Sequence, residues 1–116
     1  MMMTHADSAF VDFVVESLGP LGPVRARRMF GGYGIYLDRV MFALVADDVL
    51  YLKVDDANRG AFEALGLEPF RYEARGRTHT MSYYEAPDAG LDDPEVLYAW
   101  ARDAFAAAVR SRRARS

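Results

Sequence analysis

The glycine cluster Gly31-Gly32-Tyr33-Gly34 is the first stretch whose residue types suit a chemical task, the binding of a phosphate. Phosphate loops present backbone amides at the start of a helix, where the helix dipole also attracts the anion. Here a strand-like run follows the glycines, without a Gly-Lys-Ser/Thr sequence. We therefore interpret the cluster as a bulge, a bend or a close backbone approach. We predict that Gly31 or Gly32 has a positive φ or lies against a neighbouring segment.

Metal binding and nucleophilic catalysis need convergent ligands or an activated nucleophile, and the sequence offers little of either. His5 and His79 are the two histidines, there is no cysteine, and neither histidine has a partner at metal-ligand spacing. His79 and Ser82 are an odd number of residues apart, so a regular strand directs them to opposite faces. Glu85 shares the face of His79 but lies roughly 20 Å along the strand. The sequence predicts no catalytic residue, no metal and no cofactor.

Three acid pairs could imitate a catalytic carboxylate dyad: Asp47-Asp48, Asp55-Asp56 and Asp92-Asp93. Each pair falls at an expected turn or helix start, where aspartate forms local hydrogen bonds with the backbone. We interpret all three pairs as structural.

Arginines and tyrosines alternate in a way that suits contact with single-stranded nucleic acid, whose bases stack on aromatic rings. In the competing interpretation, the tyrosines pack against residues of neighbouring strands and the arginines are simply solvated. The net charge of −3 disfavours strong binding to phosphates. The candidate contact residues for a nucleic acid or a partner are Arg25, Arg27, Arg28, Arg71, Arg75 and Arg77.

The spacing of hydrophobic residues along the chain predicts the helices and strands that position these groups. Helices are predicted over residues 6–18, 57–65 and 94–110, the second with Asp55 as its N-cap. Strands are predicted over residues 24–37 (interrupted at 30–34), 40–46, 49–54, 70–74 and 77–84, with a loop over residues 86–91. We expect a first-helix stripe of Phe10, Phe13, Val14 and Leu18, and a third helix that packs on the sheet through Trp100 and Phe105.

Strands joined by tight turns are antiparallel, and three helices are too few to cover both faces of the sheet. The predicted fold is therefore α+β, a two-layer sandwich in the order α-β(3)-α-β(2)-α. A chain of 116 residues fits one domain, residues 1–116, with a basic tail from about residue 110. Neither a signal peptide nor a membrane span is apparent, and we expect a cytoplasmic protein without a membrane partner.

Three stretches of the chain match the sequence pattern of a known family. Residues 28–36, 41–45 and 50–53 resemble the TfoX N-terminal domain family, and matches continue through residues 69–72, 81–85 and Trp100. The motif residues to which we assign a structural role are Met29, Phe30, Gly31, Gly32, Tyr33, Gly34 and Trp100.

The resemblance implies an α+β fold and a role like that of bacterial regulators of competence and DNA transformation, which act with a transcription factor. The resemblance implies no enzyme activity. The full-length regulators carry a further C-terminal domain without a counterpart in these residues, so a stand-alone version is expected. Our leading hypothesis is a regulatory, protein-binding domain with a partner in the transcription machinery. The alternative is a weak, non-specific nucleic-acid-binding module. The oligomeric state stays open, a homodimer included.

Overall fold

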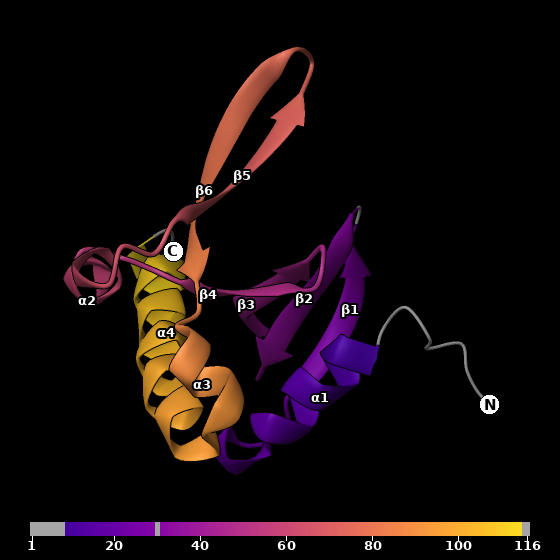
Figure 1. Ribbon diagram of the computed structural model, residues 1–116, viewed down its shortest axis with the longest axis vertical. Coiled ribbons are helices and arrows are strands. Elements are labelled where there is room, and N and C mark those ends of the chain that lie inside the picture. The colour runs from indigo at the N-terminus through magenta and orange to yellow at the C-terminus, as the bar shows by residue number, and fades with distance from the viewer. Residues whose placement is uncertain (1–8, 30, 115–116) are drawn as a thin grey trace.

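The computed structural model describes residues 9–29 and 31–114, which form a six-stranded antiparallel sheet with helices packed against it (Figure 1). The strand order is β1-β2-β3-β4-β6-β5. The strands are β1 (Arg25–Met29), β2 (Gly32–Leu37), β3 (Val40–Ala46), β4 (Val49–Lys53), β5 (Pro69–Ala74) and β6 (Arg77–Glu85). The helices are α1 (Ala9–Ser17), the short 3₁₀ turn η2 (Gly19–Leu21), α2 (Arg59–Ala64), α3 (Asp88–Asp92) and α4 (Pro94–Ala114).

The α+β class and the antiparallel sheet are confirmed, but the sheet has one strand more than predicted. Residues 24–37, expected as one interrupted strand, form the hairpin β1–β2, in which Arg25 pairs with Tyr36 and Met29 with Gly32. The observed order is therefore α-β(4)-α-β(2)-α-α, apart from η2. An irregularity of the β2–β3 ladder does occur, but it lies between Ile35 and Tyr36.

The glycine cluster has the two backbone features expected of it. Gly31 lies between the paired strands with a φ of 79°, a conformation that side chains with a Cβ rarely adopt. A Cβ added to Gly32 would overlap the backbone carbonyl oxygen of Val45 on β3. A strand rather than a helix follows these residues, as expected, so the geometry of a phosphate loop is not formed. Phe30 lies outside the described residues.

Tertiary packing shifts several predicted helices. Helix α1 is described from Ala9 and buries Val11 and Val14, whereas Phe13 is 43% exposed, so the predicted stripe was wrong at Phe13. Helix α2 begins at Arg59 rather than at residue 57. Helix α3 occupies most of the predicted loop, and α4 continues to Ala114, through the expected start of a basic tail.

The core lies between the sheet and α4. Phe42 of β3 is fully buried and meets Phe105 of α4 edge to face, with ring centroids 5.8 Å apart. Trp100 is only half-buried, and its ring packs on Phe62 of α2, 4.9 Å between centroids. Phe105 packs on the sheet as predicted, and both Phe105 and Trp100 pack against the buried core. The fully buried positions on α4 are Leu97, Ala101, Ala104 and Ala107.

Three hairpins of the sheet turn through two described residues at positive φ, the backbone of a type I′ turn. They are Asp38-Arg39 (52° and 68°), Asp47-Asp48 (51° and 59°) and Arg75-Gly76 (55° and 74°). Type I′ turns match the twist of the adjoining strands but strain any residue with a Cβ. Two of these turns have no glycine, so the strain is not relieved there.

We expect Asp48→Gly to raise the free energy of unfolding by about 0.5–1 kcal/mol, because glycine adopts a positive φ without a steric penalty. The reverse change in the third turn, Gly76→Asp, should lower it by a similar amount. Urea unfolding followed by far-UV circular dichroism measures both. If Asp48→Gly destabilised the protein, the positive φ of Asp48 would not be a source of strain.

Candidate interaction surface

The face of the sheet opposite the helices combines apolar and aromatic side chains with several charged ones. Gly34 pairs with Leu44, and Leu44 pairs with Tyr51. Side chains alternate along a strand, so these residues face away from Ile35 and Leu52, which belong to the core under the helices. We call this side the open face. The register places on it Arg25, Arg27, Met29, Tyr36, Met41, Leu44, Tyr51, Lys53, Met81, Tyr83 and Glu85.

Gly34 lets long side chains lie flat on the open face. A Cβ added there would be 2.9 Å from the Met29 sulfur, 2.9 Å from a Tyr36 ring carbon and 3.0 Å from the Met41 sulfur. These three side chains therefore converge over the glycine. Methionine is flexible and polarisable, so such a layer can adapt its shape to a partner.

Aromatic rings extend the open face onto the β5–β6 hairpin, which rises from the body of the protein as an arm (Figure 1). Tyr51 of β4 meets Phe70 with centroids 4.9 Å apart, and Phe70 stacks on Tyr72 at 6.0 Å. Tyr72 in turn stacks on its cross-strand partner His79 at 5.1 Å. His79 is half-exposed, and one face of its ring is covered by Tyr72.

An apolar groove of about 430 Å³ runs between the β1–β2 turn and the β5–β6 arm. Its floor includes Leu44 and Ala46, and its walls carry Met29 on one side and Phe70 with Met81 on the other. Among the described residues that line it, Asp47 and Arg71 are the two with charged side chains. A concave apolar surface of this kind is typical of sites that bind another molecule.

The two arginine clusters occupy opposite ends of the strand order. Arg25, Arg27 and Arg28 are exposed on the edge strand β1. The second cluster is exposed on the β5–β6 arm, and the order of strands keeps it four strands away from β1. The structure therefore does not unite the clusters into one continuous basic stripe on the sheet. The second cluster consists of Arg71, Arg75 and Arg77.

The tyrosines have packing partners within the protein. Arg28 lies over the ring of Tyr33 at 5.5 Å, and Arg27 over that of Tyr36 at 5.7 Å. These contacts favour cross-strand packing over free platforms for nucleobases, the two interpretations that the sequence left open. The other contacts are Tyr83 with Lys53, and Tyr84 with Phe62 and Glu63.

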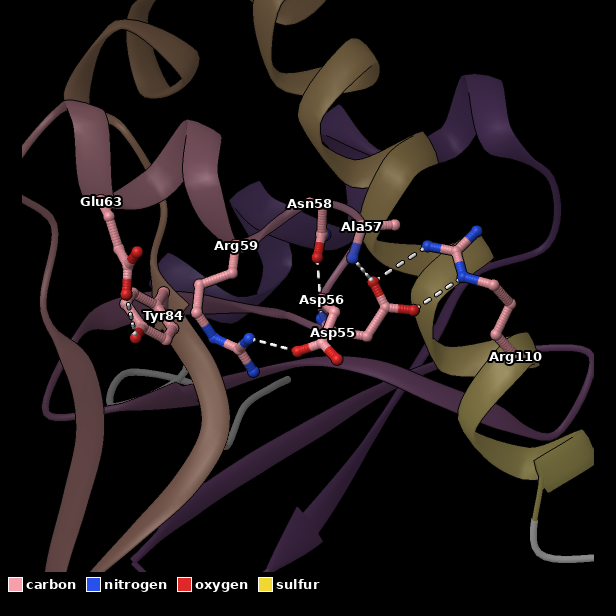
Figure 2. Close-up of polar contacts among 8 residues, drawn as sticks. All are labelled: Asp55, Asp56, Ala57, Asn58, Arg59, Glu63, Tyr84 and Arg110. Carbon is pink, nitrogen blue, oxygen red and sulfur yellow. Dashed lines mark hydrogen bonds and ion pairs between the residues drawn. The ribbon is translucent and has the colours of Figure 1, made fainter.

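Polar contacts around α2 connect segments that are far apart in the sequence (Figure 2). The Asp55 carboxylate accepts two hydrogen bonds from Arg110 of α4, from Nε at 2.7 Å and from Nη2 at 3.1 Å. Asp55 also accepts from the backbone N–H of Ala57, while the buried Asn58 side chain bonds to the backbone of Asp55 and Lys53. The sequence prediction treated Asp55 as a helix cap alone and placed Arg110 at the start of a tail.

The hydrogen bonds from Arg110 lower the pKa of Asp55, and the same pair raises the pKa of Arg110. A carboxyl group with a lowered folded-state pKa stabilises the fold above its unfolded pKa, which is about 3.9. That contribution is lost as the pH falls from there toward the lower folded-state pKa. Asp55 therefore has a structural role, which fastens the end of β4 to the last turns of α4.

We expect Asp55→Asn to lower the free energy of unfolding by about 1 kcal/mol at pH 7, because asparagine keeps the oxygen that caps Ala57 but loses the charge pair. The difference from the unchanged protein should shrink below about pH 4, where Asp55 becomes protonated. The matched control is Asp56→Asn, which removes the ion pair between the exposed Asp56 carboxylate and Arg59 and should cost less than Asp55→Asn. Urea unfolding at pH 7 and pH 3 measures both. A loss that does not change with pH would contradict the assignment.

The geometry thus offers a methionine-rich face with an apolar groove, bordered by arginines. Within the part of the chain that the structure describes, no group of three or more metal-ligating side chains gathers. None of the described helices is both long and apolar enough to cross a bilayer.

Comparison with known proteins identifies related chains. Residues 16–108 match the TfoX N-terminal domain family. "DNA transformation protein TfoX1" of Aliivibrio fischeri is 30% identical over 103 residues, 89% of this chain and 47% of that protein. "Protein Sxy" of Escherichia coli is 32% identical over 76 residues, 64% of this chain and 35% of that protein. An uncharacterised 12.7 kDa protein of Spirochaeta aurantia is 40% identical over 57 residues, about half of each chain. The matches thus span half or less of these relatives.

Proposed function

This chain belongs to the TfoX N-terminal domain family, and on that premise we propose that it is a regulatory domain which acts by binding another protein and not by catalysis. The relative in Aliivibrio fischeri is called a DNA transformation protein. We propose a related role here, in the regulation of DNA transformation genes, with a partner in the transcription machinery. Such a partner places the protein in the cytoplasm.

The observation that carries this proposal is the apolar groove on the open face. Methionines at its walls and an apolar floor that includes Leu44 and Ala46 suit a partner surface better than a small substrate. Asp55, one of the acidic residues that could have served catalysis, has a structural contact with Arg110 instead. An adaptable apolar surface with arginines nearby is typical of protein–protein interfaces, in which methionine and arginine are enriched.

The proposal is tested by capture from an extract of the native cells, followed by identification of bound proteins. We expect the unchanged chain to retain a transcription factor or an RNA polymerase subunit, and Met81→Glu, which puts a charge in the groove wall, to lose it. Phe13→Glu is the matched control, because Phe13 is an exposed apolar residue on α1, away from the groove. Capture that survives Met81→Glu, or is lost equally in both variants, would contradict the assignment to the groove. Recovery of nucleic acid alone would favour the alternative below.

A second candidate function, weak and non-specific nucleic-acid binding, rests on the exposed arginines of β1 and the β5–β6 arm. Such residues contact phosphates, and phosphate contacts carry no sequence information. The clusters lie at opposite ends of the sheet, so each presents only about three cations to one strand of phosphates.

We therefore expect no sequence-specific binding of DNA by this chain. Fluorescence anisotropy with unrelated duplexes should show similar, weak affinities at roughly 50 mM salt that fade by 200 mM, since released counterions dominate such binding. Arg27→Ala should weaken binding to every duplex alike. Affinity tighter than about 10⁻⁸ M for one duplex, retained at the higher salt, would overturn this expectation.

A further inference from the structure

A second cavity, of about 520 Å³, opens at the other end of the open face, where the last turns of α4 meet the sheet. It shares no lining residue with the apolar groove. The β2–β3 turn, the end of β4, strand β6 and α4 all contribute to it. Its lining consists of Tyr36, Arg39, Val40, Met41, Lys53, Tyr83, Ala108, Ser111 and Arg112.

Three of these lining residues are cations, and they come from three separate elements: Arg39 from the β2–β3 turn, Lys53 from β4 and Arg112 from α4. None of the described residues that line the cavity is acidic. The chain as a whole has a net charge of −3, so this concentration of positive charge differs from the average of the molecule. Clefts lined by one sign of charge raise the local concentration of ions of the opposite sign.

Internal contacts hold two of the three cations, Lys53 and Arg112, at the cavity. Nη1 of Arg112 donates to the backbone carbonyl oxygen of Arg39 at 2.9 Å, which joins α4 to the turn. The ammonium group of Lys53 lies 5.1 Å from the centroid of the Tyr83 ring. Tyr83 itself is only 6% exposed, and its hydroxyl donates to the carbonyl oxygen of Met41 at 3.3 Å. Lys53 and Arg112 are thus tied to neighbouring parts of the fold, while Arg39 and Arg112 are exposed at the mouth of the cavity.

We propose that this cavity binds a small phosphate-bearing molecule, with its phosphate group between Lys53 and Arg112. A guanidinium presents paired donors that match phosphate oxygens, and an ammonium adds a compact charge. The hydroxyl of Ser111, one residue before Arg112, can donate to the same group. A volume of about 520 Å³ lies within the usual range for small-ligand sites. This inference does not depend on the protein-binding role, because the groove and the cavity are lined by different residues.

Isothermal titration calorimetry of the full chain in about 150 mM salt, an ionic strength that screens weak surface binding, tests the proposal. The probes are inorganic pyrophosphate, ADP and adenosine. We expect saturable one-site binding of pyrophosphate and ADP, with no heat from adenosine.

Lys53→Met and Arg112→Met should each weaken binding about tenfold, the effect of one lost charge-assisted contact. Arg112→Lys, which keeps the charge but loses the paired donors, should weaken binding less than Arg112→Met does. Arg113→Met is the matched control, since Arg113 neighbours Arg112 but does not line the cavity, and it should bind as the unchanged chain does.

Several outcomes would overturn the proposal. Absence of binding at millimolar pyrophosphate would exclude the site. If Arg113→Met weakened pyrophosphate binding as much as Arg112→Met does, the binding would reflect general surface charge and not this cavity. If adenosine bound as tightly as ADP, phosphate recognition would be excluded. If a short DNA duplex binds with the same dependence on Lys53 while pyrophosphate does not, the cavity contacts a nucleic-acid backbone instead. Thermal melts of each variant confirm that it folds. Loss of the protein partner with intact pyrophosphate binding, or the reverse, separates this inference from the proposed function.

Discussion

Gly32→Ala is expected to lower the free energy of unfolding by about 3 kcal/mol, the upper end of the cost of overpacking. A Cβ at this position would overlap the carbonyl oxygen of Val45, and backbone on the neighbouring strand has no rotamer by which to move away. The β2–β3 ladder must therefore part or shift near this point. A loss of this size is a large fraction of the stability of a small domain, which is about 5–15 kcal/mol. Denaturant unfolding monitored by circular dichroism measures it.

Alanine substitutions at two other glycines serve as controls. They distinguish the steric overlap at Gly32 from the other effects of replacing a glycine. A Cβ at Gly31 has open space around it, but its φ of 79° should cost about 1–2 kcal/mol for alanine. Gly60 lies in α2 with no atom within 4 Å of an added Cβ, so Gly60→Ala should stabilise the protein by about 0.5–1 kcal/mol. The expected order of stability is thus Gly60→Ala, Gly31→Ala, then Gly32→Ala. Equal effects of Gly31→Ala and Gly32→Ala would contradict the close approach to β3.

Phe62→Ala is expected to cost about 3–5 kcal/mol, because it removes a fully buried ring from the contact between α2, β6 and α4. The ring of Phe62 meets Trp100 edge to face at 4.9 Å and tilts against Tyr84 at 5.8 Å. Helix α2 spans only six residues, too few to be stable without such an anchor. Loss of the ring should therefore loosen α2 from the body of the protein, which hydrogen exchange of residues 59–64 would detect.

Trp100→Ala should cost about 2 kcal/mol, less than Phe62→Ala, because part of the Trp100 ring is already exposed to water. The double variant should lose about 0.5–1.5 kcal/mol less than the sum of the single losses, which is the usual worth of an aromatic pair. Phe13→Ala is the control, since Phe13 is 43% exposed and should change stability by less than about 0.5 kcal/mol. Strict additivity of the two single losses would show that the rings do not interact.

Local patterns were sufficient to predict most elements of this fold. Alternating apolar residues marked β3 and β4, and Asp92-Asp93-Pro94 marked the start of α4, because strand pleating and helix capping act within a few residues. The glycine cluster was correctly separated from a phosphate loop, since its sequence context excludes a helix after it. The number of strands around the same cluster was predicted wrongly, because glycine is favoured both in a bulge within one strand and in a tight turn between two strands. Only the pairing of Met29 with Gly32 decides between them.

The sequence by itself therefore determined the α+β class, the type of nearly every element and the family to which the chain belongs. The tertiary structure decided which residues meet. Asp55 reaches Arg110 across 55 positions, and Arg39 meets Arg112 across 73. The open face, the apolar groove and the cationic cavity exist only once the register of the strands and the docking of α4 are set. Register and docking depend on burial and loop closure summed over the whole chain, whereas periodicity and capping depend on neighbours alone.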